Sequence, residues 1–207
     1  KYAKKNNIPV PKDKKGAPPF SIDDNLFHTS TEGKVLEDPK NAAPEFIFQR
    51  TSSPERAPNK SSFVNINFKN GDPIGINGKK LLPSKILDKL NQLAGKNGIG
   101  RVDLVENRFI GIKSRGVYET PGGTLLMQDH RAIESFTLDK ETMHKKDLIM
   151  PRYAELIYNG YWYSKERSKL QKIDKQKRNK VNGSVKLRLY KGNIAIQSRI
   201  TKSTAYS

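Results

Sequence analysis

The sequence predicts an α+β fold, in which helices pack on a mixed, largely antiparallel sheet. Two pairs of strand-like segments are each joined by a short turn, one at Asn70-Gly71 and one at residues 191–193. Helical patterns separate these pairs, and strands and helices do not alternate regularly as they do in a parallel sheet. The turns therefore favour antiparallel pairing with helices covering the sheet.

The amino-terminal part is predicted to be poor in regular structure. Residues 1–7 fit the end of a helix, 8–11 a short extended piece and 12–19 a charged linker. Small polar residues over 20–30 are typical of an element boundary. Residues 37–59 contain four prolines, which predicts a loop with one short strand at 45–49.

The strands are predicted from alternation and turn residues. Residues 63–68 alternate apolar and polar, and 74–76 return after Asn70-Gly71. A second pair spans 185–190 and 193–197. Between these pairs, 101–105 and 108–113 fit strands on either side of a corner at Glu106-Asn107.

The helices are predicted from apolar spacing and from their end residues. One begins at Pro83 and closes near Gly95 and Gly98. The others are 124–136, a helix capped by Asp139, a helix from Pro151 to Asn159-Gly160, and a strongly basic helix over 164–181.

Composition alone excludes few functions. A net charge of +18 fits either an anionic partner or a lysine-rich solvated surface. The lysines are spread over every segment, which favours the second interpretation. No apolar run reaches the ~18–20 residues that span a bilayer, and the absence of cysteine fits a cytoplasmic protein.

Common catalytic patterns do not appear in the sequence. His28, His130 and His144 lack the spacing of metal ligands, so no metal site is predicted. No nucleophile elbow and no glycine-rich phosphate loop occurs, so the chain should not bind ATP by itself.

The stretch 100–124 is the strongest candidate for a binding site. It combines five glycines with side chains such as Glu106 and Tyr118, and it is predicted to end in a glycine-rich loop where backbone approaches a ligand. Taken alone, Glu106 fits a turn carboxylate and Tyr118 a core residue. Ser21 and Ser30 fit caps or turn hydroxyls equally well.

Aromatic residues cluster over 158–163, directly before the basic stretch 165–180. The cluster could be a base-stacking platform, which makes a basic nucleic-acid-binding module the alternative function. Packing of these rings on the sheet at a helix end is the favoured interpretation.

Several motifs resemble the carboxy-terminal half of argininosuccinate synthase. The clearest is Lys113-Ser-Arg-Gly-Val-Tyr-Glu-Thr-Pro-Gly-Gly-Thr124. The others follow in the family's order: Phe20-Ser-Ile-Asp-Asp-Asn-Leu-Phe-His-Thr-Ser30, Ala94-Gly-Lys-Asn-Gly-Ile-Gly-Arg101, Val105-Glu-Asn-Arg108, Tyr153-Ala-Glu-Leu-Ile-Tyr-Asn-Gly160 and Leu189-Tyr-Lys-Gly-Asn193. The resemblance therefore covers essentially the whole chain.

The resemblance implies a ligase that forms a C–N bond. ATP activates the ureido oxygen of citrulline as a citrullyl-adenylate, and aspartate displaces AMP to give argininosuccinate. Ser21, Ser30, Glu106 and Tyr118 occupy the family's citrulline-contacting positions; no catalytic residue is implied here. Lys113 and Arg115 either add positive potential near the substrates or belong to the scaffold.

The resemblance also implies a division of the enzyme. Residues 1–19 match the end of the nucleotide-binding domain and a linker, and 20–207 match the synthetase and oligomerisation domain with its carboxy-terminal arm shortened. The chain starts at Lys1 instead of Met, which favours a piece of a longer protein. ATP with Mg²⁺, and aspartate, are expected to bind mainly to the absent half. The expected enzyme is a cytoplasmic homotetramer without nucleic-acid or membrane partners, and this piece alone is expected to be inactive.

Overall fold

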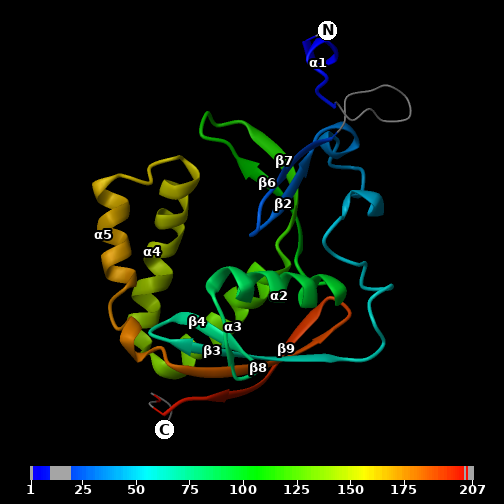
Figure 1. The fold of residues 1–207 in the computed structure, drawn as a ribbon. Helices are drawn as coiled ribbons and strands as arrows, with labels where there is room; N and C mark the ends of the chain where they lie inside the picture. The colour runs from blue at the N-terminus through cyan, green and yellow to red at the C-terminus, as the bar shows by residue number, and fades with distance from the viewer. Residues whose placement is uncertain (1, 10–19, 203, 205–207) are drawn as a thin grey trace.

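The computed structural model describes residues 2–9, 20–202 and 204, and it confirms the α+β fold. It has two antiparallel sheets where one was predicted, with strand orders β1-β2-β7-β6 and β5-β4-β3-β8-β9 (Figure 1). The predicted linker at 12–19 and the end of the extended piece at 8–11 lie outside the described residues. Near the amino terminus, a single helical turn, α1, spans Tyr2–Lys5.

The five-stranded sheet carries the main core on one face. Its strands are β3 (Ser62–Lys69), β4 (Asp72–Ile76), β5 (Lys79–Lys80), β8 (Gly183–Tyr190) and β9 (Asn193–Ile200). Alternate residues of β3 (Val64, Ile66 and Phe68) are buried, and Val64 and Ile66 lie opposite the buried Leu187 and Val185 of β8. The period of two that predicted a half-buried strand is confirmed.

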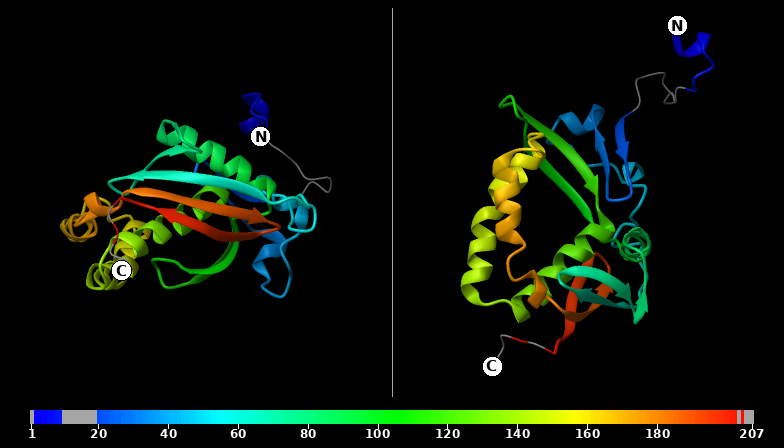
Figure 2. Two further views of the ribbon diagram at one scale, coloured as in Figure 1. Left: turned by 90° about the horizontal axis from the view of Figure 1, so that it is seen from below. Right: turned by 60° about the vertical axis from the view of Figure 1, so that its left-hand side comes forward.

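Two helices cover this face of the sheet. α2 (Pro83–Lys96) and α3 (Pro121–Thr137) lie against it, while the other face is left uncovered in the view from below (Figure 2). α2 contributes Ile86 and Leu90 to the core, and α3 contributes Leu125 and Ile133. Spacing by three to four residues places each set on one side of its helix.

The four-stranded sheet lies beyond α2 and α3 and positions the candidate site. It consists of β1 (Ser21–Asp24), β2 (Thr29–Glu32), β7 (Lys113–Glu119) and β6 (Arg101–Asn107). A small core of Leu36, Ile47 and Val117 packs on one face, with the 3-10 turns η1 (Lys34–Glu37) and η2 (Glu45–Ile47). The opposite face does not carry this core.

α4 (Lys140–Tyr158) and α5 (Lys165–Asp174) form a helical hairpin beside both sheets (Figures 1 and 2). The predicted Asp139 cap is confirmed, since its side chain accepts from the Thr142 amide. At the base of the hairpin, the buried Lys146 ammonium pairs with Glu134 of α3 and with Asp174 of α5, 3.0 Å away. The hairpin is thus anchored at its base.

Three predicted elements are wrong in the helical and loop regions. The strand at 45–49 is the 3-10 turn η2. The helix break at Pro151 is absent because Pro151 lies on the exposed side of α4, where solvent can replace the missing hydrogen bond. The basic helix ends at Asp174, well before 181, and Lys177 then takes a left-handed conformation (φ 59°) ahead of η3 (Arg178–Lys180).

The predicted strand at 108–113 is also wrong. Residues 108–112 form the turn between β6 and β7, closed by the Arg108 amide donating to the Ile112 carbonyl at 2.8 Å. Glu106 therefore lies within β6, not at a corner, and the stretch predicted as a glycine-rich loop is strand β7. Ile110 and Ile112, which suggested a strand, are exposed at this turn.

Candidate functional site

The register of the four-stranded sheet places the predicted site residues on one face. Ser30 lies opposite Tyr118, and Tyr118 lies opposite Val102. The pair of Glu106 and Ser114 lies four residue pairs further along the same two strands. On the edge strand, Ser21 lies opposite Glu32. Directly opposed residues, and every second residue along a strand, share a face. All four predicted citrulline-contacting residues therefore point to the same side.

Glu106 is the centre of the contacts on this face. The Tyr118 hydroxyl donates to Oε1, and the Tyr158 hydroxyl of α4 donates to Oε2 at 2.6 Å. The nearest guanidinium nitrogen of Arg108 is 3.9 Å from Oε2, while Arg108 donates to Glu32 at 2.9 Å. The Glu106 carboxylate is thus held by two neutral donors and is only 8% exposed.

Gly116 makes the contact between Glu106 and Tyr118 possible. It lies between them on the same face of β7, and a Cβ there would be 2.6 Å from the Tyr118 ring and 3.0 Å from Oε1 of Glu106. These distances are below van der Waals contact. The absence of a side chain at residue 116 therefore allows the phenol to lean across the strand to the carboxylate.

A cavity of about 440 Å³ opens on this face between β6, β7 and the end of α4. Its lining combines the apolar Val102 and Leu104 with polar groups from Glu106, Tyr118, Thr120 and Tyr158. The hydrogen bond to Glu106 is the largest cause that raises the pKa of Tyr158, which favours the neutral, donating phenol. An apolar wall with a negatively charged end suits a small molecule that has an aliphatic stem and a cationic head.

The two serines are less closely associated with the cavity. Ser30 is buried and adjacent to Tyr118, whereas Ser21 is exposed at the sheet edge. Neither lines the 440 Å³ cavity. The structure thus brings Glu106 and Tyr118 into contact, and leaves the serines further along the same face.

Lys113 and Arg115 lie on the opposite face. The Arg115 guanidinium makes two hydrogen bonds to Asp103, at 2.9 and 2.6 Å, and also donates to the Asn41 carbonyl at 2.8 Å. Lys113 donates to the Asn107 side chain at 2.6 Å. Of the two interpretations, the structure supports the scaffold role.

Gly122 and Gly123 lie in close contact with side chains of neighbouring elements. A Cβ at Gly122 would be 2.7 Å from the Asn91 side-chain oxygen, and one at Gly123 would be 2.9 Å from the Phe27 ring. Both residues lie in the first turn of α3, which begins at Pro121. These glycines therefore allow close packing of α3 on its neighbours, and the loop predicted there is the first turn of a helix.

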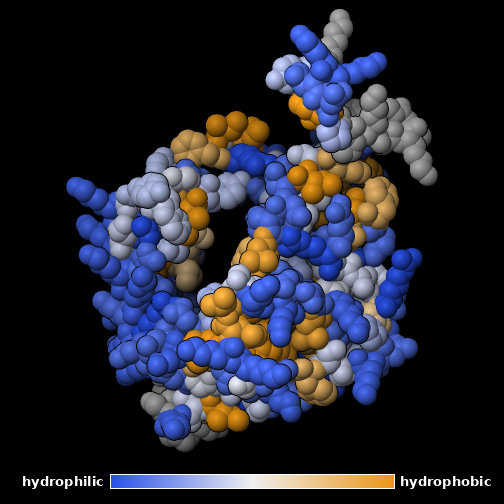
Figure 3. All heavy atoms as spheres, viewed as in Figure 1, coloured by the Kyte–Doolittle hydropathy of each residue, from blue (hydrophilic) through white to orange (hydrophobic). Residues whose placement is uncertain are grey.

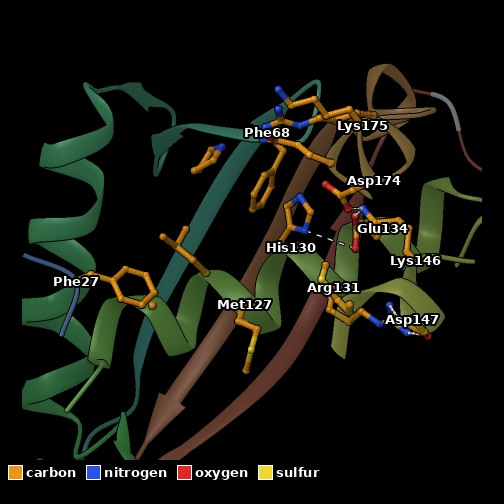
Figure 4. A pocket seen from close by; sticks show the side chains of 16 residues that line it. Phe27, Phe68, Met127, His130, Arg131, Glu134, Lys146, Asp147, Asp174 and Lys175 are labelled. Carbon is orange, nitrogen blue, oxygen red and sulfur yellow. Dashed lines mark hydrogen bonds and ion pairs between the residues drawn. The ribbon is translucent and has the colours of Figure 1, made fainter. Parts of the chain in front are cut away.

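A second cavity of about 720 Å³ lies between α3, α4, α5 and the edge of the five-stranded sheet. Figure 4 shows His130, Glu134, Lys146 and Asp174 gathered at one end of it. Burial opposes ionisation of Glu134, but hydrogen bonds from His130 and Lys146 outweigh it and lower the pKa of Glu134 to about 2. These charges satisfy one another, so they fasten the α4–α5 hairpin instead of offering a free binding group.

Tyr158 contacts Glu106 in this cavity, although the sequence did not single it out as a site residue. It lies in the aromatic cluster at 158–163, whose predicted packing on the sheet is only partly correct. Tyr161 contacts Phe109 at the β6–β7 turn, with ring centroids 6.2 Å apart, whereas Tyr163 is 93% exposed. The contact of Tyr158 with Glu106 crosses from helix to sheet, which periodicity along the chain does not reveal.

Within the described part of the chain, no three His, Cys, Asp or Glu side chains gather as metal ligands. In the same residues, no helix is long and apolar enough to cross a membrane.

Fold and cavity together define an α+β domain with a small-molecule-sized cavity on one sheet face. The family described as "Arginosuccinate synthase C-terminal domain" matches residues 20–207. The chain therefore belongs to the argininosuccinate synthase family, which confirms the resemblance noted in its motifs.

Curated relatives agree with this assignment. Proteins named argininosuccinate synthase from Pelagibacter ubique and Mesorhizobium japonicum are 83% and 58% identical over 207 and 206 residues. One from Granulibacter bethesdensis is 55% identical over 206 residues. All of this chain is covered in each case, but only 52%, 51% and 50% of the relatives. The chain thus spans about half their length, and the nucleic-acid-binding alternative gains no support.

Proposed function

We propose that this chain supplies the citrulline-binding part of an argininosuccinate synthase, a ligase of arginine biosynthesis that condenses citrulline with aspartate and consumes ATP. Family membership supports the reaction class. The observation that carries the proposal is the Glu106 carboxylate, held by the Tyr118 and Tyr158 hydroxyls at the polar end of a 440 Å³ cavity.

The cavity suits the chemistry of citrulline. The α-ammonium requires a buried partner, and a carboxylate such as Glu106 can accept charge-assisted hydrogen bonds from it. Val102 and Leu104 offer apolar surface for the aliphatic stem. The Ser21 and Ser30 hydroxyls on the same face are proposed to contact the more distant polar groups of the substrate. These residues would orient citrulline for attack on ATP, and none of them is assigned a chemical step.

The rest of the reaction is assigned to the remainder of the enzyme. The chain spans about half the length of its relatives, and we assign Mg²⁺, ATP and aspartate mainly to that remainder. Residues 1–19 are proposed to end the nucleotide-binding domain, and 20–207 to form the synthetase and oligomerisation domain. A cytoplasmic homotetramer completes the proposal. The 207-residue chain alone is expected to be inactive, and turnover of citrulline, aspartate and ATP by it would contradict this division.

The test uses a full-length hybrid in which this chain replaces the matching 207-residue region of the Pelagibacter ubique relative. Glu106→Gln removes the negative charge while keeping the side-chain shape. We expect the KM for citrulline to rise about 30-fold or more, because a hydrogen bond between charged groups is lost. Steady-state assays with each substrate varied in turn measure this effect.

Glu37, which is exposed, provides the matched control, because Glu37→Gln is the same substitution at a site away from the cavity. Glu37→Gln should leave all kinetic constants of the hybrid unchanged, and Glu106→Gln should leave the KM for ATP and aspartate within about twofold. An unchanged citrulline KM in Glu106→Gln would refute the proposed site.

A further inference from the structure

Tyr158 lies at the last position of α4 and reaches the four-stranded sheet from the other side of the cavity. Its hydroxyl donates to Oε2 of Glu106 at 2.6 Å, while Tyr118 holds Oε1 from within the sheet. We infer that Tyr158 is a positioning residue of the amino-acid site, which orients the Glu106 carboxylate for the ammonium of the substrate. This inference rests on the function proposed above.

The chemistry of the phenol supports this role. A carboxylate has about four lone-pair positions, so two phenol donors fix its plane and leave positions for an ammonium. Both phenols are neutral, so they orient Glu106 without cancelling the negative charge that attracts the substrate. A cationic partner in the same place would compete with the ammonium. Arg108 forms a long ion pair with Oε2 of Glu106 at 3.9 Å, but its hydrogen bond goes to Glu32 at 2.9 Å, so it leaves the hydrogen-bonding positions of Glu106 to the phenols and the ammonium.

Ion pairs of the α4–α5 hairpin fix the position of α4, and therefore of Tyr158 at its end. At the base, the buried Lys146 joins α4 to Glu134 of α3. Arg152 links the two helices of the hairpin through a 2.8 Å ion pair with Glu166 of α5, and it also pairs with Glu155 within α4. These ion pairs place the end of α4 beside the cavity although that helix belongs to another part of the fold.

At its other end, the hairpin touches the sheet mainly through side chains. Gly160 (φ 80°) turns the chain directly after α4, and the Tyr161 ring meets Phe109 with centroids 6.2 Å apart. Figure 3 shows the surface hollowed between the hairpin and the body of the molecule. The Tyr158–Glu106 hydrogen bond is thus a direct link between the two sides of this hollow, and Tyr158 forms the helical wall of the cavity.

The experiment removes one hydroxyl from the full-length hybrid. Tyr158→Phe keeps the ring, so the cavity wall remains. We expect the citrulline KM to rise about tenfold, with kcat and the KM for ATP and aspartate within about twofold of the parent. Tyr163→Phe is the matched control, because that tyrosine lies in the short connection directly after α4 and is 93% exposed.

A double-mutant cycle separates positioning through Glu106 from a general effect of the hydroxyl. If Tyr158 acts by orienting Glu106, Tyr158→Phe should change the citrulline KM by less than about twofold in the Glu106→Gln background. Independent, multiplying effects of the two substitutions would overturn the inference.

Failure of this inference can be told from failure of the proposed function. If Tyr158→Phe leaves the citrulline KM unchanged while Glu106→Gln raises it, only the role of Tyr158 is refuted. If neither substitution changes it, the proposed citrulline site is refuted as well.

Discussion

The two faces of the four-stranded sheet each carry a glutamate with low exposure, and the two are bound in different ways. Glu119 accepts hydrogen bonds from the amides of Gln49, Arg50 and Thr51 at 2.8–2.9 Å and from the Thr51 hydroxyl at 2.7 Å. Glu106, on the other face, accepts from two phenols beside a cavity.

The difference separates a structural carboxylate from a binding one. Four protein donors occupy Glu119, and three of them are backbone amides fixed by the chain. Glu106 keeps acceptor capacity after its two phenol contacts, and it borders open volume that a ligand can enter. The number and kind of donors, more than burial, therefore indicate which glutamate has a role in binding.

The largest effect is expected at Glu119. Glu119→Ala would leave three backbone amides without an acceptor, so the free energy of unfolding should fall by about 3–5 kcal/mol. Urea unfolding followed by circular dichroism measures this loss. Glu37→Ala, which removes an exposed carboxylate, serves as the control. A loss below about 1 kcal/mol would show that the loop at 49–51 does not depend on Glu119.

Asp129 extends the comparison to a buried carboxyl without donors. It lies on the core side of α3 with Leu125 and Ile133, it is 0% exposed, and neither of its oxygens has a partner. Burial raises the pKa of Asp129 from 3.8 to about 8. The folded state therefore holds a proton that the unfolded state releases, and stability falls as pH rises from about 3.8 to about 8.

Removing this carboxyl should stabilise the protein. We expect Asp129→Ala to raise the free energy of unfolding by about 2 kcal/mol at pH 8 and to flatten its dependence on pH between pH 5 and 8. Urea unfolding at several pH values tests both effects. Asp88→Ala is the control, because Asp88 accepts a hydrogen bond from Gln92 on α2. An unchanged pH dependence in Asp129→Ala would show that the carboxyl is solvated in the folded protein.

Local patterns in the sequence predict much of the fold. Alternation gives β3, turn residues give the β3–β4 and β8–β9 hairpins, and apolar spacing gives α2. The errors occur in segments whose secondary structure depends on solvent exposure or on pairing with distant strands. Pro151 continues a helix because its side faces solvent, and residues 113–119 become a central strand because β2 and β6 pair with them.

The candidate site is predictable in part. The resemblance selects Glu106, Tyr118, Ser21 and Ser30, and the register places all four on one face. The resemblance gives no reason to choose Tyr158, because this residue reaches Glu106 only after α4 folds against the sheet from 52 residues away. Apart from the resemblance, no local pattern separates Glu119 from Glu106, since their roles depend on which face each side chain occupies.

Substitution of Gly116 tests whether the face that carries Glu106 can lose binding while the protein keeps its stability. In Gly116→Ala, the new Cβ would meet the Tyr118 ring at 2.6 Å and Glu106 at 3.0 Å, so both side chains must shift. Alanine is tolerated in a strand, and the free energy of unfolding should change by less than about 1 kcal/mol. The citrulline KM of the hybrid should nevertheless rise about tenfold, because the orientation of Glu106 is lost.

Ser114→Ala is the control for this substitution. Ser114 lies on the same strand and face and accepts from Arg108 at 3.0 Å, without contacting Tyr118. The citrulline KM of the hybrid with Ser114→Ala should stay within about threefold of the parent, because the Tyr118 phenol and the Glu106 carboxylate keep their positions. Equal effects of Gly116→Ala and Ser114→Ala would mean that this face responds to any change in β7. In that case the close approach at residue 116 would not be what holds Tyr118 on Glu106.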